Sequence, residues 1–341
     1  MEYIGADVDI NNVVCSIMSA SGKKKETFVV PSNPKGMDQL IEKMGNPKKW
    51  KILFESGTYS TDLHIHLVKK GVQSAIANAY NLKLISGSRK KTDKNDSIAL
   101  ARYLRLWDRG ELELSISTIV SGDDQKLRDL CRLREKYAQE KGRTAQQISA
   151  HMRRNGEYLD ESKYPNLTAD KALNFILETY TDDFVLCDMV NHYAYLVSKC
   201  ENIDTKLENS QLHKTEVQLL SSIPGVGKLS ATQLMSAVVD ISRFETQGRF
   251  KSYFGMAPKV TDSGGKEHHG HITKMGDPMV RHILYRIIYT HMRLTPNGHI
   301  SRYYEACVKR MGKAKARTAA ACKLLDLMFA ILKRGTRYVY R

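Results

Sequence analysis

The chain has 341 residues, of which 42% are hydrophobic and 26% are charged, with a formal net charge of +16. This length allows two or three domains with buried cores, and the composition excludes a disordered or fibrous protein. The excess of lysine and arginine favours a polyanionic partner, because these side chains bind phosphates and release counterions. We therefore expect a nucleic-acid-binding protein; a protein that is merely basic is the alternative.

The first part of the chain predicts a mixed α/β sheet. Residues 3–19 predict two strands joined by a polar turn at Asn11–Asn12. Alternating and helical spacings then predict a strand over 22–31, a helix over 36–45 and a strand over 49–56. A helix over 60–71 follows, with Ser60 or Thr61 as its cap. A strand over 72–79 and a helix that begins near Asp93 complete this part. This order places an α/β domain at residues 1–122.

Four carboxylates stand at special points of this pattern: Asp7 and Glu55 end two apolar strands, and Asp93 and Asp96 share one face at the start of a helix. If the two strands are neighbours, the acids meet at one sheet edge. Clustered oxygen ligands are what Mg²⁺ or Mn²⁺ requires, and such metals assist phosphoryl transfer. Taken singly, each acid has a structural alternative: a strand-end or surface charge for the first two, and a helix N-cap or a favourable dipole charge for the others. Asp9 is a possible supporting acid.

The middle of the chain predicts a helical hairpin or coiled coil over residues 123–215. A helix starts after Ser121-Gly122 with a stripe of Leu127, Leu130, Leu133 and Tyr137, and a second helix is expected from Phe184 to Leu220. Residues 155–183 contain Pro165 and predict an irregular connection with a short helix at 171–180. The hairpin either dimerises the protein or packs as a subdomain within one subunit.

The last part, residues 216–341, predicts mainly helices. The sequence SSIPGVGKLSATQL predicts a helix-hairpin-helix-like element, in which Gly225 and Gly227 form a tight turn and amides near Lys228 face a phosphate. An ordinary turn between helices is the alternative. The stretch SGGKEHHGHITK predicts a phosphate-binding loop, in which Gly264 and Gly265 allow close approach and Lys266 and Lys274 supply charge. Zinc is disfavoured because His268 and His269 are adjacent and no cysteine is near. Arg281 and the basic residues after it predict further phosphate contacts.

The six cysteines form no CxxC pair and predict reduced, mostly buried thiols. The N-terminal residues lack the features of a signal peptide, and no apolar run reaches membrane-spanning length. We therefore expect a cytoplasmic protein with no membrane association.

Three motifs, IGADV, FESGTYS and KTDKNDSIALA, together with the later PGVG and SGGKEHHGH segments, closely resemble one insertion-sequence transposase family. It is the "IS one-hundred-and-ten" family, which is related to Piv-type DNA invertases. The resemblance covers both ends of the chain, whereas the middle matches only in its helical character. It implies a ribonuclease H-like (RuvC-like) first domain in which Asp7, Glu55, Asp93 and Asp96 form a DEDD metal site.

The same resemblance implies that Ser263, which matches the serine of the family's SG motif, is the nucleophile that attacks DNA. From the residues alone Ser263 begins a polar turn, and Ser252 and Thr261 compete with it. The resemblance also implies donor and target double-stranded DNA, a bridge-type guide RNA and a homo-oligomer (dimer or tetramer). Two other functions stay open: a metal-dependent, junction-resolvase-like nuclease that uses water, and a non-catalytic nucleic-acid-binding derivative.

Overall fold

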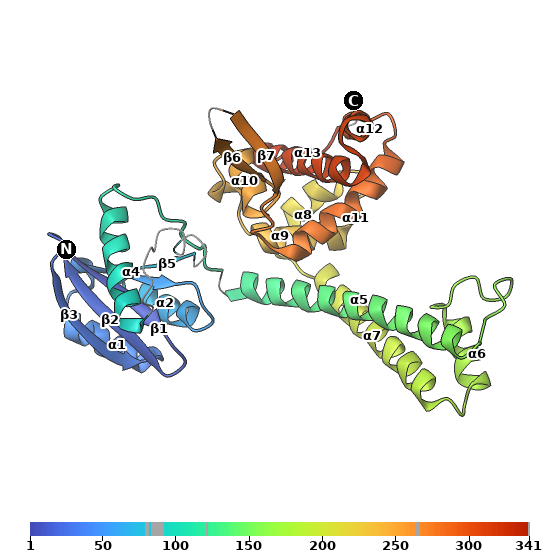
Figure 1. The fold of residues 1–341 in the computed structure, drawn as a ribbon, viewed down its shortest axis with the longest axis horizontal. Coiled ribbons are helices and arrows are strands. Elements are labelled where there is room, and N and C mark those ends of the chain that lie inside the picture. Colours follow the sequence, from blue (N-terminus) through green and yellow to red (C-terminus); the bar gives the residue numbers. More distant parts are fainter. Residues whose placement is uncertain (79–81, 83–91, 121, 264–265, 340–341) are drawn as a thin grey trace. The chain divides into compact units, whose positions relative to one another are not determined.

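The computed structural model describes residues 1–339 except 79–81, 83–91, 121 and 264–265, and it does not describe the side chains of residues 260–269. The chain divides into two compact units, Met1–Ile119 and Val120–Arg341. The expected first boundary, after residue 122, lies close to this division, and the expected boundary after residue 215 lies inside the second unit. The predicted α/β first part and mainly helical last part are confirmed at this level (Figure 1).

The first unit is built on a five-stranded sheet with the strand order β3-β2-β1-β4-β5. The strands are β1 (Glu2–Val8), β2 (Asn12–Ser19), β3 (Lys24–Pro31), β4 (Trp50–Glu55) and β5 (Gln73–Ala77). β1, β2 and β3 pair antiparallel, whereas β1 with β4 and β4 with β5 pair parallel. The sequence therefore predicted all five strands, and the sheet is mixed as expected.

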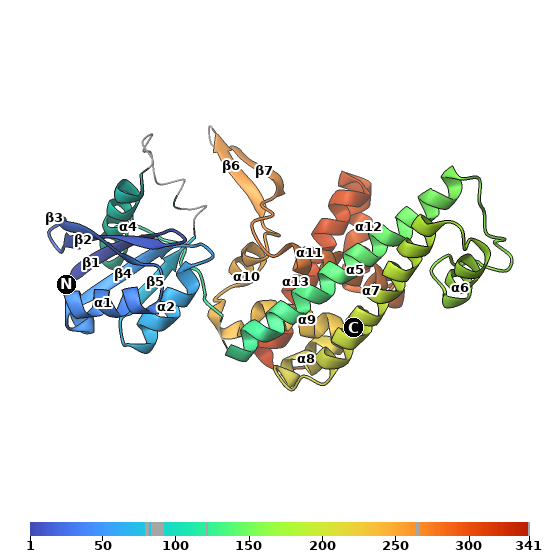
Figure 2. The same ribbon diagram turned by 90° about the horizontal axis from the view of Figure 1, so that it is seen from below.

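Among the described residues, three helices cover the two faces of this sheet: α1 (Pro34–Met44), α2 (Ser60–Lys69) and α4 (Asp93–Asp108). Figure 2 shows α1 and α2 on one face and α4 on the other. Ile4, Ile52 and Phe54 point into the core under α1 and α2. Tyr3 and Leu53 instead pack with Leu100 and Leu104 of α4, as the alternation of side chains along a strand requires.

The predicted cap of α2 is wrong. The N-cap residue is Tyr59, whose side chain makes no capping hydrogen bond, and Ser60 is the first helical residue. The Ser60 hydroxyl instead accepts from the Gly57 amide and donates to the Gly57 carbonyl, both at 3.0 Å. The Ser60 hydroxyl thus stabilises the turn after Glu55 and does not cap the helix.

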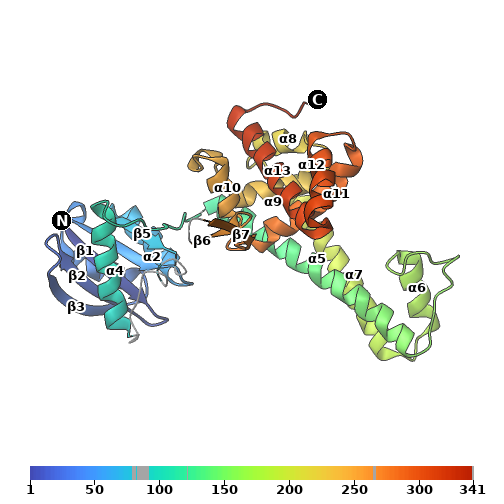
Figure 3. The same ribbon diagram turned by 45° about the horizontal axis from the view of Figure 1, so that its top comes forward.

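The second unit begins with a helical hairpin, as predicted. Its arms are α5 (Gly122–Arg154) and α7 (Phe184–Glu208), and α6 (Asp170–Thr179) packs against both arms at the far end of the hairpin (Figure 3). Arg134 holds Asp204 through two hydrogen bonds of 2.9 Å, which ties the two arms together. At the base, Leu127, Cys131 and Leu207 join the core of the helices that follow. The hairpin therefore packs as part of this unit.

Two details of the predicted hairpin are wrong. The second helix does not continue to Leu220: it ends at Glu208, and α8 (Lys214–Ser221) begins after a turn in which His213 has a left-handed backbone, with φ of 53°. The His213 imidazole is 2.7 Å from Asp124 in the first turn of α5, which fixes this break. In α5, Leu133 is 39% exposed, and the buried stripe runs instead through Leu127, Cys131 and Glu135.

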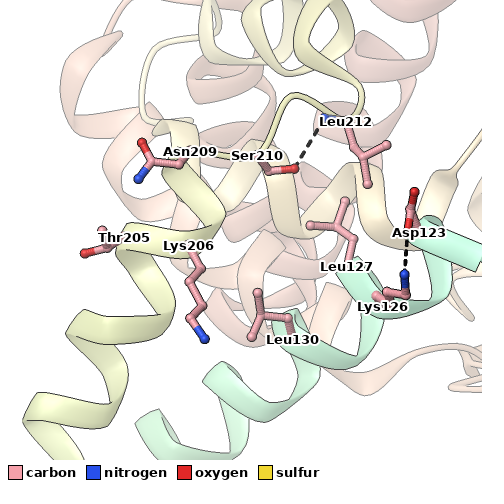
Figure 4. Close-up of a pocket in the computed structure, with 9 residues that line it drawn as sticks. All are labelled: Asp123, Lys126, Leu127, Leu130, Thr205, Lys206, Asn209, Ser210 and Leu212. Atoms are coloured by element: carbon pink, nitrogen blue, oxygen red, sulfur yellow. Dashed lines mark hydrogen bonds and ion pairs between the residues drawn. The ribbon is translucent and has the colours of Figure 1, made fainter.

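A hollow of about 470 Å³ accompanies the break between α7 and α8 (Figure 4). Leu127 and Leu130 of α5 face Lys206 and Leu212 across it, and its rim carries the Asp123–Lys126 ion pair at 2.8 Å. None of the predicted site residues lines it.

The remaining elements form the body of the second unit. They are α9 (Lys228–Val238), α10 (Gln247–Tyr253), α11 (Pro278–Leu294), α12 (His299–Met311), α13 (Lys313–Arg334), and the antiparallel strands β6 (Pro258–Ser263) and β7 (Lys266–Ile272). Their core is made by aliphatic residues of α9, α11 and α13 and by Phe250 and Phe254. No helix among the described residues is long and apolar enough to span a membrane.

All six cysteines are free thiols, and four of them are buried, in line with the predicted reduced and mostly buried thiols. Burial raises the pKa of Cys15 to about 12 and that of Cys131 to about 11. These thiols therefore stay protonated and act as small apolar core groups.

Candidate active site

Asp7 and Glu55 lie on adjacent strands, which is the condition for the two acids to share one sheet edge. In the parallel pairing of β1 with β4, Ala6 stands opposite Phe54, and the two acids are the next residues along each strand. Paired strands are about 4.8 Å apart, so the two carboxylates start from neighbouring backbone positions. Both strands end within a residue of this point, because the chain turns away after Val8 and after Glu55.

Both acids also face the same side of the sheet as α4. An ideal Cβ on Gly5 would lie 2.0 Å from the Ser97 carbonyl oxygen and 2.3 Å from the Ala101 amide, so Gly5 faces α4 directly. Asp7 is two residues further along β1, and Glu55 is two residues beyond Leu53, which packs against α4. Because side chains alternate along a strand, Asp7 and Glu55 point to the α4 side.

The direction of α4 brings its first turn to this same edge. At the far end of the helix, the Tyr3 hydroxyl donates to Asp108 at 2.9 Å. Nearer its start, the hydroxyls of Ser97 and Ser16 are 2.8 Å apart, in the interior. The helix therefore runs opposite to β1, and Asp93 and Asp96 lie in the turn beyond Ser97, toward the end of β1 that carries Asp7. Only a glycine in β1 permits this close crossing.

The four acids remain accessible to a ligand. Asp93 is exposed, and Asp7, Glu55 and Asp96 are half-buried. The N-cap of α4 is Thr92, whose hydroxyl accepts from the Asn95 amide at 3.3 Å, so the alternative of Asp93 as the N-cap is wrong.

Carboxylate oxygens are the ligands that Mg²⁺ and Mn²⁺ prefer. Within the part of the chain that the structure describes, no group of three or more His, Cys, Asp or Glu side chains is placed to hold a metal ion. The donor set nevertheless fits Mg²⁺ in kind, because Mg²⁺ usually takes one or two carboxylates and completes its shell with water and substrate phosphate. The four acids share an edge without forming a closed cage.

In the second unit, the predicted PGVG turn lies between α8 and α9. Gly225 has φ of +87°, and a Cβ there would lie 2.7 Å from the amide nitrogen of His291, so both its conformation and its surroundings require glycine. Gly227 is the N-cap of α9 and provides no side-chain cap. Lys228 is exposed, and its ammonium donates to the Glu208 carbonyl at 2.6 Å, which links it to the end of α7.

His291 fixes this turn from α11. Its Nδ1 donates to the Pro224 carbonyl at 2.8 Å, and the side chain is 1% exposed. Burial lowers the pKa of His291, while the bond to Pro224 opposes that shift. A lowered folded-state pKa means that the neutral ring stabilises the fold, and that this stability is complete above the unfolded pKa and is lost as the pH falls.

We therefore expect the second unit to lose stability as the pH falls below about 6.5, the ordinary pKa of histidine. The measurement is urea unfolding at pH 7.5 and 5.5, followed by far-UV circular dichroism. His291→Phe should lower the stability at pH 7.5 by about 1–3 kcal/mol, because the Pro224 carbonyl loses its donor, and should reduce the dependence on pH. An unchanged pH dependence in His291→Phe would assign that dependence to other groups.

Ser263 ends β6 and Lys266 begins β7, and the two residues pair across the hairpin. Their side chains, and the whole of Gly264 and Gly265, lie outside the described residues. The hairpin therefore carries the predicted nucleophile at its tip, while the side-chain geometry there stays a prediction. Ser252 lies in α10, exposed and away from this tip in the sequence.

The base of this hairpin is held by close backbone contacts. A Cβ on Gly255 would lie 2.5 Å from the Met275 amide, and one on Gly276 would lie 2.4 Å from the Phe254 carbonyl carbon. The Arg281 guanidinium donates to the carbonyls of Phe254, at 3.2 Å, and Gly276, at 2.7 Å. Arg281, predicted to contact phosphates, thus joins the segments on either side of the hairpin. Lys274 is exposed in this base, with a left-handed φ of 57°.

Comparisons with known proteins match two regions of the chain, one that contains the four acids and one that contains the β6–β7 hairpin. Residues 4–156 match a family model for DEDD-type transposases, and residues 217–305 match a model described as the transposase IS116/IS110/IS902 family. The chain is 26% identical over 361 residues to the pilin gene-inverting protein of Moraxella bovis, covering 98% of this chain and 96% of that protein. It is 23% identical over 252 residues to the transposase for insertion sequence element IS1328 of Yersinia enterocolitica, covering 72% and 74%. It is 24% identical over 304 residues to the transposase for IS1533 of Leptospira borgpetersenii, covering 85% of each chain.

Proposed function

The chain belongs to the IS116/IS110/IS902 family of transposases, DNA-recombining enzymes, and we propose that it cleaves and rejoins DNA through a serine nucleophile assisted by a metal-binding acid cluster. Asp7, Glu55, Asp93 and Asp96 form the cluster, and Ser263 is the nucleophile. The observation that supports this most is the arrangement of the first unit. Acids from three separated segments reach one sheet edge, where Gly5 lets α4 cross β1 closely.

The proposed reaction is a transesterification. The Ser263 Oγ loses its proton and attacks a DNA phosphorus, one P–O bond of the strand breaks, and the free DNA hydroxyl leaves. The product is a phosphoserine ester, so the number of phosphodiester bonds is conserved and the reverse attack by a DNA hydroxyl rejoins a strand. Mg²⁺ or Mn²⁺, when bound, would neutralise charge that develops on the phosphate oxygens. The four acids would hold the metal ion, and the exposed position of Asp93 leaves room for DNA.

The proposal includes the finer organisation that the sequence suggests. The first domain (residues 1–122) would be RuvC-like, residues 123–215 would form a hairpin or coiled-coil linker, and residues 216–341 would carry the serine hairpin. Gly225, Gly227 and Lys228 would contact nucleic acid at the PGVG turn, and Lys266 and Lys274 would do so at the serine hairpin, while Arg281 would act by holding the base of that hairpin. The partners would be donor and target DNA, a bridge-type guide RNA and further copies of the chain in a dimer or tetramer.

The test is covalent trapping. Wild type, Ser263→Ala and Asp93→Ala are incubated with labelled element-end DNA, Mg²⁺ and co-purified RNA, and the products are separated on a denaturing gel. We expect an adduct of protein and DNA with the wild type and none with either variant. Ser252→Ala is the matched control and should keep the adduct.

Cleaved DNA without an adduct in the wild type would contradict the serine mechanism. That result would instead support a metal-dependent nuclease that uses water, for which the acids alone suffice. Binding without any Mg²⁺-dependent cleavage would point to a non-catalytic derivative.

A further inference from the structure

The last helices carry most of the excess charge of the chain. Residues 278–341 contain fourteen Lys and Arg and only two acids, Glu305 and Asp326, whereas the whole chain has a net charge of +16. Three quarters of the net charge therefore lies in α11, α12, α13 and the segment after them. Such a surface attracts a phosphate backbone whatever its sequence.

A hollow of about 830 Å³ opens within this basic region, between the base of the β6–β7 hairpin and helices α10, α12 and α13. Gly270 of β7 and Thr318 of α13 both line it. The apolar side chains of Ile272 and Met311 line part of it, and the half-buried ring of Tyr303 forms one wall. Three lysines, Lys251, Lys315 and Lys323, line it as well. This combination of an apolar floor and a cationic rim is typical of sites for single nucleotides.

Two charged residues organise the hollow. Lys323 lies over the Tyr303 ring, 5.4 Å from its centroid. Asp326 is held by Lys251 at 2.9 Å. Both Lys323 and Asp326 also line a second hollow of about 420 Å³.

The thiol in this site does not suggest chemistry of its own. Burial raises the pKa of Cys322 to about 11, and its Sγ donates to the Met256 carbonyl at 3.3 Å. Cys322 is therefore a protonated, structural group that supplies no nucleophile to the hollow.

We propose that this hollow binds one unpaired nucleotide of a nucleic-acid strand. The base packs against Tyr303 and Met311, Lys323 and Lys315 contact the flanking phosphates, and Asp326 accepts a hydrogen bond from an exocyclic amino group of the base. A base-paired nucleotide cannot enter, because its edges and faces are occupied by its partner and its neighbours. The inference rests on the proposed function in one respect, that the chain acts on nucleic acid.

The first test measures binding of fluorescent twelve-nucleotide single strands to wild type, Lys323→Gln and Lys309→Gln. Both variants remove one positive charge, but the exposed Lys309 on α12 does not line the hollow. We expect Lys323→Gln to weaken single-strand binding about tenfold more than Lys309→Gln, because only Lys323 holds a phosphate of the strand seated in the hollow, with equal effects of the two variants on duplex binding. Equal losses on single strands would overturn the site.

The second test uses the base itself. Cytosine and adenine carry an exocyclic amino group, whereas thymine and uracil do not. Wild type should bind oligo(dC) or oligo(dA) more tightly than oligo(dT), and the isosteric Asp326→Asn should reduce that preference. A preference for oligo(dT) in the wild type, or one that Asp326→Asn leaves unchanged, would contradict the role of Asp326. Parallel oligo(C) and oligo(U) strands show whether RNA or DNA is the better ligand.

Two outcomes separate this inference from the proposed function. Loss of the covalent adduct in Ser263→Ala tests the recombination chemistry alone. If the wild type forms no adduct but Lys323→Gln weakens single-strand binding more than Lys309→Gln does, the chemistry fails and the nucleotide site stands. If the adduct forms and Lys323→Gln matches Lys309→Gln, the nucleotide site fails and the chemistry stands.

Discussion

Asp7→Asn is expected to slow DNA cleavage by about 10²–10³-fold, the loss seen when one preorganised electrostatic partner of a transition state is removed. The substitution keeps the size of the side chain and removes its negative charge. Asp7 is half-buried at the end of β1, on the side of α4, so the change falls within the proposed acid cluster. The measurement is the rate of adduct formation at saturating Mg²⁺, together with DNA affinity and the thermal midpoint, which should both stay near the wild-type values.

Asp9→Asn is the matched control for this prediction. Asp9 is two residues further along the chain, beyond the end of β1, and is exposed. The same chemical change there should lower the rate by less than about threefold if Asp9 is a plain surface charge, because a solvated charge contributes little. If Asp9→Asn lowers the rate of adduct formation strongly and Asp7→Asn lowers it little, Asp9 rather than Asp7 belongs to the acid cluster. That result would contradict the cluster proposed above.

Gly5→Ala is expected to destabilise the first unit by at least about 3 kcal/mol, at or beyond the upper range for overpacking a core. The added Cβ would lie 2.0 Å from the Ser97 carbonyl oxygen, so backbone rather than a flexible side chain must move. Because Ser97 follows Asp96 directly, the same shift would displace both acids of α4. Urea unfolding followed by tryptophan fluorescence reports this unit, since both tryptophans, Trp50 and Trp107, belong to it.

Gly57→Ala serves as the control. Gly57 has an ordinary φ, and a Cβ there would meet only the Ser60 hydroxyl, at 3.9 Å. We expect a change of less than about 1 kcal/mol. If Gly5→Ala unfolds at the same urea concentration as Gly57→Ala, α4 does not cross β1 as closely as described. In that case the placement of the four acids at one edge loses its support.

Local sequence was enough to predict the elements and the chemical character of the site. The apolar alternation around Asp7 and Glu55 predicted two strands with acids at their ends, and the spacing of Asp93 and Asp96 placed both in the first turn of a helix. Period and composition are local properties, and they persist whatever the chain packs against. The motifs around these acids and Ser263 were also sufficient to indicate the family.

Other features depend on residues far apart in the sequence, and they became visible only in the folded chain. α7 ends at Glu208 because His213 contacts Asp124, which is 89 positions away in the sequence. The helical spacing of residues 184–220 does not indicate this contact. Arg281 has the character of one of many surface cations, but the fold places the Phe254 and Gly276 carbonyls around it. Gly5 carries no signal in the sequence, since its role depends on the crossing of α4. Long-range packing assigns a partner to each of these groups, and the partner determines whether a charge binds a ligand or holds the fold.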